Sequence, residues 1–282
     1  MTIFADADVE RFVLDSRVPG PPLTVAELRE GSAARARARP AGPAMPVADR
    51  LVAGVPVRVY EQESRARVVY LHGGGFVLGD LDTHDLVCRR LAAATATTVV
   101  AVDYRRAPEH PFPAALDDAL AVLGWAAEAG PVAVAGDSAG AFVAVLAARR
   151  AAVPLVAQLL VCPLLDLGLG GASAEEFGRG FTLDVADLRE WVSWWAPEAH
   201  AVPNPLHFAL EGMPPALIVA AGLDPLRDGA VRYAQRLRAA GVGAELRVEP
   251  GLVHNHPMYA QLARSAERAY AGFLTDAAAI LR

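Results

Sequence analysis

The chain has 282 residues, of which 54% are hydrophobic and 21% are charged, and its formal net charge is -6. This apolar content excludes disorder as the main state. The acidic balance argues against a nucleic-acid-binding protein, which usually carries a basic surface. All 26 basic residues are arginine, so no lysine is available as a nucleophile or base. The length fits one large domain or two small ones.

Cysteine and histidine are too scattered for a disulfide framework or a metal module. Cys88 and Cys162 lie far apart, and no set of possible ligands has convincing metal-site spacing. Residues 1–12 carry acidic side chains where a secretory signal needs a basic start and an apolar run. The longest apolar stretch, Leu155–Leu165, is too short to span a bilayer. We therefore expect a cytoplasmic protein without stable membrane insertion, metal or cofactor.

Short β-branched segments alternate with longer helical ones. We expect strands at Val55–Tyr60, Val68–His72, Thr98–Tyr104, Val132–Gly136, Leu155–Cys162, Ala216–Ala221 and Ala244–Glu249. We expect helices at Thr83–Ala94, Ala114–Ala129, Ser138–Arg150, Asp228–Ala240 and Tyr259–Leu281. Several strands are apolar throughout, as expected for strands covered on both faces. The alternation predicts an α/β protein with a mostly parallel, doubly wound sheet.

Two regions do not follow the alternation. In the first, residues 1–48, a short acidic helix precedes a segment with Arg35, Arg37 and Arg39, which we interpret as a solvated linker rather than a nucleic-acid arm. The second, residues 166–213, is longer than a crossover needs, so we expect an insertion above the sheet. It carries three of the four tryptophans: Trp191, Trp194 and Trp195. Their spacing also fits packing on one helix face.

The segment Gly136–Gly140, with the sequence GDSAG, follows an apolar strand and precedes a helical segment. A serine at such a sharp turn is held in a strained conformation that exposes its hydroxyl. Gly136 and Gly140 remove side chains that would collide across the turn, and Asp137 completes the motif with Ala139. The motif alone also occurs as an ordinary glycine turn. The strand and helix around it favour Ser138 as a nucleophile.

A second motif, HGGGF at residues 72–76, also follows an apolar strand. Its glycines are Gly73, Gly74 and Gly75. They let the backbone approach a substrate and turn its N–H groups inward, and we expect His72 to order the loop by hydrogen bonds. The alternative, a phosphate-binding loop, lacks the G-x-G-x-x-G spacing and a Lys-Ser/Thr pair. We expect the N–H groups of Gly73, Gly74 and Ala139 to stabilise an oxyanion.

A serine nucleophile needs a base and a group that orients the base. Asp224 and His254 follow two later strands, at the carboxyl ends where open parallel sheets form their sites. Asp228 is the alternative carboxylate, although it also fits as a cap of the helix it begins. His256 is the alternative base. The order Ser138, Asp224, His254 is the one typical of such a fold.

These motifs resemble those of the hormone-sensitive-lipase-like bacterial esterases within the α/β-hydrolases. HGGGF at 72–76, GDSAG at 136–140, GLDPLRD at 222–228 and the His254 loop occur in that family's order, as do YRRAPEHPFP at 104–113 and residues 84–92. The resemblance covers nearly the whole chain. It implies a mostly parallel eight-stranded sheet with helices on both faces, one antiparallel strand near the N-terminus, a helical cap and a homodimer through the sheet edge.

On this basis we expect a single domain, with cap elements at about 1–45 and 166–213 and a catalytic core at about 46–165 and 214–282. The family usually has a small residue and then Phe after the catalytic histidine, where this chain has Asn255 and His256. It also usually has leucine where this chain has Arg106. The Asn255-His256 departure leaves substrate preference open.

The expected function is hydrolysis of short- to medium-chain carboxylic esters through an acyl-enzyme. The substrate pocket is expected to include Phe76, Trp191 and Trp195, although packing within the cap is an alternative role for the tryptophans. An amidase, lactonase or carbamate hydrolase would use the same triad. A non-catalytic small-molecule receptor is a remote alternative, because it would be expected to lack a triad residue, whereas all three are present.

Overall fold

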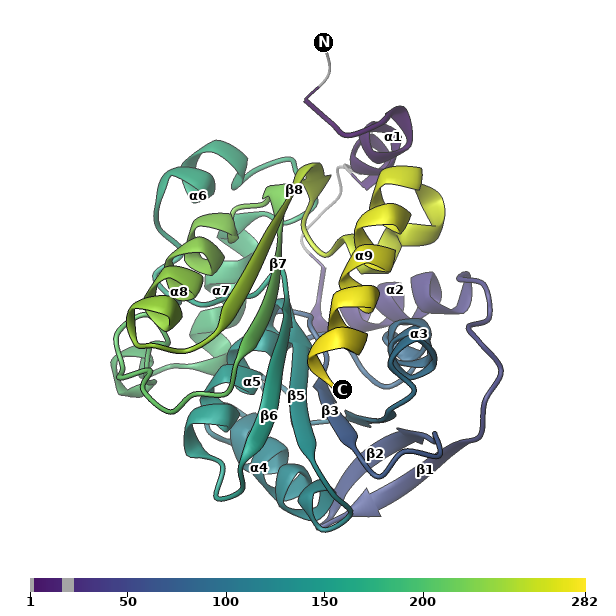
Figure 1. The fold of residues 1–282 in the computed structure, drawn as a ribbon. Coiled ribbons are helices and arrows are strands. Elements are labelled where there is room, and N and C mark those ends of the chain that lie inside the picture. Colours follow the sequence, from purple (N-terminus) through teal and green to yellow (C-terminus); the bar gives the residue numbers. More distant parts are fainter. Residues whose placement is uncertain (1–2, 17–22) are drawn as a thin grey trace.

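The protein is built around one eight-stranded sheet (Figure 1). The computed structural model describes residues 3–16 and 23–282. The strands are β1 (Val47–Val52), β2 (Val55–Tyr60), β3 (Arg67–Leu71), β4 (Thr98–Val102), β5 (Val132–Asp137), β6 (Leu155–Val161), β7 (Ala216–Leu223) and β8 (Ala244–Val253). They lie in the order β1-β2-β4-β3-β5-β6-β7-β8. β2 is antiparallel to both of its neighbours and the other pairs are parallel, which confirms the expected sheet.

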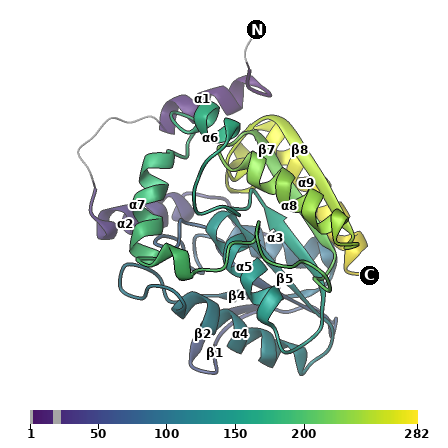
Figure 2. The same cartoon turned by 90° about the vertical axis from the view of Figure 1, so that its left-hand side faces the viewer.

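Helices cover both faces of the sheet. They are α1 (Ala7–Ser16), α2 (Val25–Arg37), α3 (Asp85–Thr95), α4 (Ala114–Ala127), α5 (Ser138–Arg150), α6 (Ala172–Phe177), α7 (Val185–Trp195), α8 (Arg227–Ala239) and α9 (Arg264–Ile280), with 3-10 segments η1 (Ala199–Ala201) and η2 (His256–Leu262). α3 and α9 pack on one face, and α4, α5 and α8 on the other (Figure 1). Figure 2 shows α1, α2, α6 and α7 along one side of the molecule.

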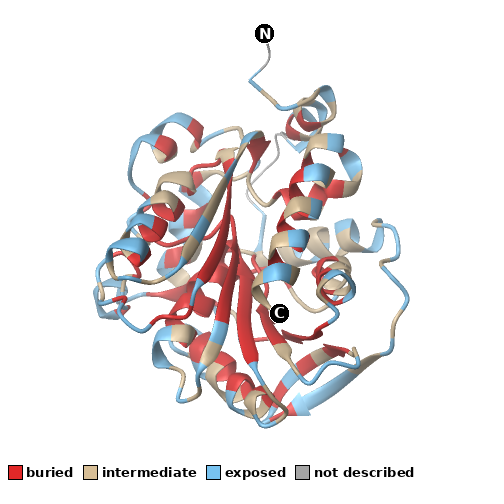
Figure 3. Ribbon diagram, in the orientation of Figure 1, coloured by how far each residue is buried: buried red, intermediate tan, exposed pale blue. Residues whose placement is uncertain are grey.

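The central strands are buried on both faces, as the red ribbons of Figure 3 show. In β3, Val69 and Leu71 belong to the apolar cluster on one face, whereas Val68 and Tyr70 belong to the cluster on the other. Successive side chains of a strand point to opposite faces, so a strand covered on both sides must be apolar throughout. This is the physical reason for the continuous apolar runs in the sequence.

The edge strand β1 was not among the predicted strands. It pairs with β2 through a tight turn at Ala53 and Gly54, both of which have positive φ. Such two-residue turns usually carry Asn-Gly or Asp-Gly, because these residues tolerate positive φ. The turn here has alanine in the first position, and the exposed middle of β1 interrupts its apolar pattern. Neither of the usual hairpin signals was therefore present.

The interpretation of the arginine-containing segment, residues 32–46, as a solvated linker was wrong for its first part, which forms the end of helix α2. Helix α2 extends to Arg37, and its start is fixed by a capping box between Thr24 and Glu27. The Thr24 side chain accepts from the Glu27 N–H, and the Glu27 carboxylate accepts from the Thr24 N–H. This T-x-x-E pattern is visible in the sequence and marks a helix start. Its neighbouring prolines and glycines obscured it.

The C-terminal helical segment is divided, unlike the single helix expected from Tyr259 onward. Residues His256–Leu262 form η2, in which Tyr259 has non-helical backbone angles, and α9 begins at Arg264. The Tyr259 hydroxyl exchanges hydrogen bonds with the backbone of Val253, which holds the segment beside the end of β8.

Within residues 3–16 and 23–282, no helix is long and apolar enough to cross a membrane.

Candidate active site

Ser138 lies at the turn between β5 and α5 and has a φ of 51°. A non-glycine residue in this left-handed region is strained, and such strain is concentrated at functional sites. The turn is closely packed: a Cβ at Gly136 would lie 2.7 Å from the Gly140 carbonyl carbon, and one at Gly140 would collide with the Leu71 carbonyl oxygen. Both positions therefore require glycine, as the motif predicted.

Ser138, His254 and Asp224 form a continuous hydrogen-bonded chain. His254 Nε2 lies 3.0 Å from Ser138 Oγ, and His254 Nδ1 lies 2.8 Å from Asp224 Oδ2. Asp224 is fully buried, and its other carboxylate oxygen accepts the Leu226 N–H at 2.9 Å. The carboxylate is thus held rigidly behind the imidazole. The parallel strands β5, β7 and β8 bring residues separated by more than a hundred positions to one edge of the sheet.

The two alternative residues lie elsewhere. His256 is fully buried, and its Nδ1 lies 3.9 Å from Cys162 Sγ rather than near the serine. Asp228 pairs with Arg227 and accepts the Ser173 N–H at 2.9 Å. Asp228 therefore joins the first turn of α6 to α8, and it does not act as the side-chain cap of its own helix that the sequence suggested.

The glycine loop differs from the expected oxyanion arrangement at one position. The Gly73 N–H donates to Asp137 Oδ1 at 3.0 Å, so it is not free to bind an oxyanion. The N–H groups of Gly74 and Gly75 have no hydrogen-bond partner within the described ranges. A Cβ at Gly75 would collide with the Trp191 ring. The free donors are therefore those of Gly74 and Gly75, rather than Gly73 and Gly74, together with the N–H at the start of α5.

The buried ring of His72 is hydrogen-bonded to the glycine loop. Its Nδ1 lies 2.9 Å from the Gly73 carbonyl oxygen, and its ring stacks on Tyr104 with centroids 4.2 Å apart. The Tyr104 hydroxyl donates to the His72 carbonyl oxygen at 2.6 Å. Burial lowers the pKa of His72 to about 3, so its imidazole is neutral and its contribution to the site is structural.

Asp137 links the motifs to one another. Its carboxylate accepts from Tyr70 Oη at 2.7 Å and from Asn255 Nδ2 at 2.6 Å, in addition to the Gly73 N–H. Burial alone would raise the pKa of Asp137, but the nearby His84 and the hydrogen bonds from Tyr70 and Asn255 lower it well below its usual value. The carboxylate is therefore ionised, and it ties the glycine loop and the His254 loop to the serine turn.

Asn255 was missed as a positioning residue, although it was noticed as a departure from the family pattern. It has a φ of 57°, a conformation that asparagine tolerates better than most residues. Its side chain reaches Asp137, and its backbone N–H donates to Cys162 Sγ at 3.4 Å. The sequence signal was therefore present, but its partner could only be found in the folded protein.

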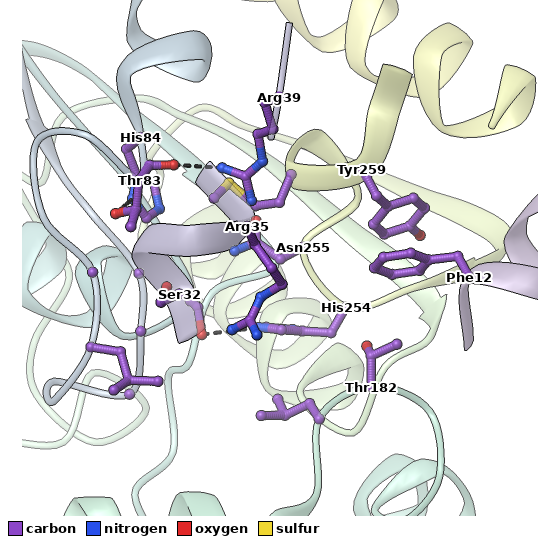
Figure 4. A pocket seen from close by; sticks show the side chains of 18 of the residues that line it. Phe12, Ser32, Arg35, Arg39, Thr83, His84, Thr182, His254, Asn255 and Tyr259 are labelled. Atoms are coloured by element: carbon purple, nitrogen blue, oxygen red, sulfur yellow. Dashed lines mark hydrogen bonds between the residues drawn. The ribbon is translucent and has the colours of Figure 1, made fainter. Parts of the chain in front are cut away.

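The Ser138 hydroxyl opens into a cavity of about 520 Å³. Its wall combines the glycine loop and the His254 loop with residues of α1, α2 and α7, so both segments predicted as cap contribute to it. Figure 4 shows Phe12 and Tyr259 stacked along one part of this wall. Trp191 also lines it.

The other two expected pocket residues are not on the cavity wall. Phe76 and Trp195 are fully buried and stack on each other with centroids 3.8 Å apart. Phe112 and Phe142 contact the same Trp195 ring edge-on. These aromatic residues therefore pack α7 against the core, the alternative role considered for the tryptophans.

One group in the described part of the chain has the spacing of possible metal ligands: Cys162, Asp224 and His254. Two of its members are already joined by the 2.8 Å contact between imidazole and carboxylate. Burial raises the pKa of the third, Cys162, which disfavours the thiolate that binds metals. These residues do not fit a resident metal ion.

A doubly wound sheet with a serine at the β5–α5 turn, followed in the chain by its aspartate and histidine, defines the α/β-hydrolase class. In agreement, residues 68–258 match the family model described as an alpha/beta hydrolase fold. The chain therefore belongs to the α/β-hydrolase family, in the hormone-sensitive-lipase-like group that its motifs indicated.

Named relatives and a solved structure give the same result. The chain is 42% identical to esterase LipI of Mycobacterium tuberculosis over 81% of this chain and 76% of that protein. It is 41% identical to carboxylesterase NlhH of the same species, over 76% of this chain and 75% of the relative. A crystal structure of an esterase from the bacterial hormone-sensitive lipase family superimposes over 100% of both chains, with a TM-score of 0.91 and 26% identity.

Proposed function

We propose that the protein is a carboxylic ester hydrolase that acts through an acyl-enzyme on Ser138. The observation that carries this proposal is the hydrogen-bonded chain from Ser138 through His254 to the buried Asp224. The relatives named esterase and carboxylesterase match this chain over about three quarters of their own length. Their names support the same reaction class.

In this mechanism, His254 Nε2 takes the hydroxyl proton of Ser138 as Oγ attacks the ester carbonyl carbon. Asp224 keeps the Nδ1 proton in place and stabilises the imidazolium. The tetrahedral intermediate collapses, and His254 gives the proton to the leaving alcohol. Water then attacks the acyl-enzyme by the same route and releases the acid. In each half of the cycle, His254 accepts one proton and then donates it.

We assign the oxyanion donors to the N–H groups of Gly74, Gly75 and Ala139. A donor of this kind stabilises the transition state by roughly 3 kcal/mol, because it is already oriented in a site that excludes water. Asp137 supports this role by occupying the Gly73 N–H, which fixes the orientation of the next two peptide units.

The cavity of about 520 Å³ suits short- to medium-chain acyl groups. Amides, lactones and carbamates could react by the same steps, but the named relatives favour esters. A receptor without catalytic activity is disfavoured, since a binding protein has no need of an aligned triad.

The decisive experiment measures hydrolysis of 4-nitrophenyl esters of increasing chain length, beside matched amides and lactones. We expect Ser138→Ala to lower kcat by at least about a thousandfold and to abolish labelling by a fluorophosphonate. Ser193→Ala, in an exposed part of α7, is the matched control and should behave as the wild type. Full esterase activity in folded Ser138→Ala would refute the proposal.

A cytoplasmic location and a homodimer remain predictions. The sheet ends at β8 on one side, where Val248 is exposed, and an unpaired strand edge favours pairing with a second copy. Sedimentation velocity of the wild type and Val248→Asp tests the dimer: a dimer through this edge should dissociate in the variant.

A further inference from the structure

Two arginines line the cavity beside Ser138, although the protein as a whole is acidic. The chain has 32 acidic and 26 basic residues, yet the cavity wall includes Arg35 and Arg39 and no Asp or Glu side chain. Figure 4 shows both arginine side chains at this cavity. A neutral ester requires no such charge, so the two arginines call for an explanation beyond the proposed reaction.

Ion pairing distinguishes these two arginines from their neighbours. Arg29 binds Glu109 at 2.7 Å, and Arg37 binds Glu30 at 2.6 Å. Within the described ranges, Arg35 and Arg39 form no ion pair with a carboxylate. Basic residues are favourable at the end of α2 because of the helix dipole. That effect accounts for their position in the sequence but not for the cavity that they face.

Arg39 is held in place with donors to spare. One of its nitrogens donates to the Thr83 carbonyl oxygen at 2.6 Å, and a guanidinium has five N–H donors in all. Burial and then the positive charge of Arg35 lower the pKa of Arg39, whereas Asp137 raises it. Two cations close enough to repel each other gain most from an anion placed between them.

We propose that the ester bound in this site carries a carboxylate away from the scissile bond, and that Arg35 and Arg39 hold it. The planar guanidinium matches a carboxylate with two parallel hydrogen bonds. The substrate is thus either a monoester of a dicarboxylic acid or an ester formed on the hydroxyl group of a hydroxy acid, so that one carboxylate stays free. This inference rests on the proposed esterase function. In it, the two arginines are specificity-determining residues.

The test compares charged esters with neutral ones of the same shape. Mono-4-nitrophenyl glutarate, with 4-nitrophenyl pentanoate as its neutral partner, places the carboxylate on the acyl side. The pair 4-acetoxybenzoate and 4-acetoxyacetophenone places it on the alcohol side. We expect kcat/KM for the charged member of at least one pair to exceed that of its partner by about tenfold or more. The preference should decrease with added salt.

The variants are Arg35→Gln and Arg39→Gln, with Arg37→Gln as the matched control on the same helix. Arg37 is exposed and lines a different surface hollow. The charged-to-neutral ratio of kcat/KM should fall at least about fivefold in each of the first two variants and stay unchanged in the control. Arg39→Lys should recover part of the preference, even if loss of the Thr83 contact weakens the site.

Failure of this inference is separable from failure of the proposed function. Equal kcat/KM for both members of each pair, or ratios that the arginine variants leave unchanged, would overturn the anion site and leave the esterase intact. If no ester is hydrolysed, the proposed function fails, and calorimetric binding of glutarate decides the anion site. Binding that is lost in Arg35→Gln and Arg39→Gln supports it, and no binding to the wild type refutes it.

Discussion

A single buried carboxylate connects the parts of the candidate site. Asp137 accepts hydrogen bonds from Tyr70, from the Gly73 backbone and from Asn255, and these groups come from β3, the glycine loop and the loop after β8. Buried networks of this kind are stable only when every member is satisfied. Asp137 therefore fixes how the glycine loop and the His254 loop lie relative to Ser138.

Replacing this carboxylate by an amide should damage both stability and activity. In Asp137→Asn, the amide NH2 group must face at least one of the donors, and an unsatisfied buried donor costs about 1–3 kcal/mol. We expect a lower urea midpoint and a lower kcat, with a smaller change in KM. Tyr70→Phe, which removes one donor and leaves the carboxylate, should be the milder variant. Wild-type stability and kcat in Asp137→Asn would contradict the role assigned here.

At the level of helices and strands, α2 packs Val25 and Leu28 against the core and is joined to the rest of the protein by the polar contacts of one arginine. None of its residues is buried, but Arg29 donates to the Val77 and Ala107 carbonyl oxygens and forms two contacts with Glu109, at 2.7 and 2.8 Å. Because α2 forms part of the cavity wall, the contacts of Arg29 help to hold that wall in place.

Removal of the Arg29 contacts should release α2 without unfolding the sheet. In Arg29→Gln we expect faster tryptic cleavage after Arg35 and Arg37, detected by mass spectrometry, and a largely unchanged global unfolding transition. Arg11→Gln, at an exposed pair with Asp8, is the control. Equal cleavage rates in the two variants would show that α2 is held by other contacts.

The same contacts should weaken in acid. Hydrogen bonding to Arg29 lowers the pKa of Glu109 from 4.5 to about 2. A carboxylate whose pKa is lower in the folded state contributes stability that is complete above the unfolded value and is lost as pH falls toward the folded one. Tryptic cleavage cannot be followed there, so hydrogen exchange of α2 between pH 5 and pH 3 is the measurement. The protection factors of the α2 amides, which correct for the intrinsic pH dependence of exchange, should decrease in the wild type as pH falls and be less pH-dependent in Arg29→Gln.

At the scale of the whole molecule, two buried neutral histidines make the folded protein less stable as pH falls. Burial lowers the pKa of His72 and of His256 from 6.5 to about 3, and one ring nitrogen of each has no hydrogen-bond partner within the described ranges. The unfolded chain binds a proton at each site below pH 6.5, whereas the folded chain does not. These two histidines therefore leave the free energy of unfolding unchanged above pH 6.5 and lower it steadily as pH falls toward 3.

The free energy of unfolding, measured with urea, should accordingly fall between pH 6.5 and pH 5. Each histidine contributes about 1.4 kcal/mol per pH unit at most. His256→Phe removes one of the two groups and should reduce this slope by about half. His200→Asn changes an exposed ring and is the control. A pH-independent unfolding free energy in this range would show that neither ring stays neutral in the folded protein.

Local sequence patterns predicted seven of the eight strands and the turn at Ser138. Short β-branched segments, several of them apolar throughout, indicated the strands from β2 to β8. The glycines around Ser138 indicated a close turn, which the contacts of Gly136 and Gly140 explain. β1 was missed because an alanine occupies its turn, and the last part of α2 was interpreted as a linker because prolines and a glycine follow it. The family and the fold, inferred from motif order, are confirmed.

The sequence alone determined the parallel sheet, the close turn at Ser138 and the order of Ser138, Asp224 and His254, because these depend on periodicity and on short motifs. Only the tertiary structure decided which glycine N–H groups are free, because the partner of Gly73 is 64 residues away in Asp137. The same holds for Arg35 and Arg39, which are ordinary surface residues until α2 is packed beside the serine. Contacts between segments distant in the chain depend on the packing of the whole fold, which no local pattern encodes.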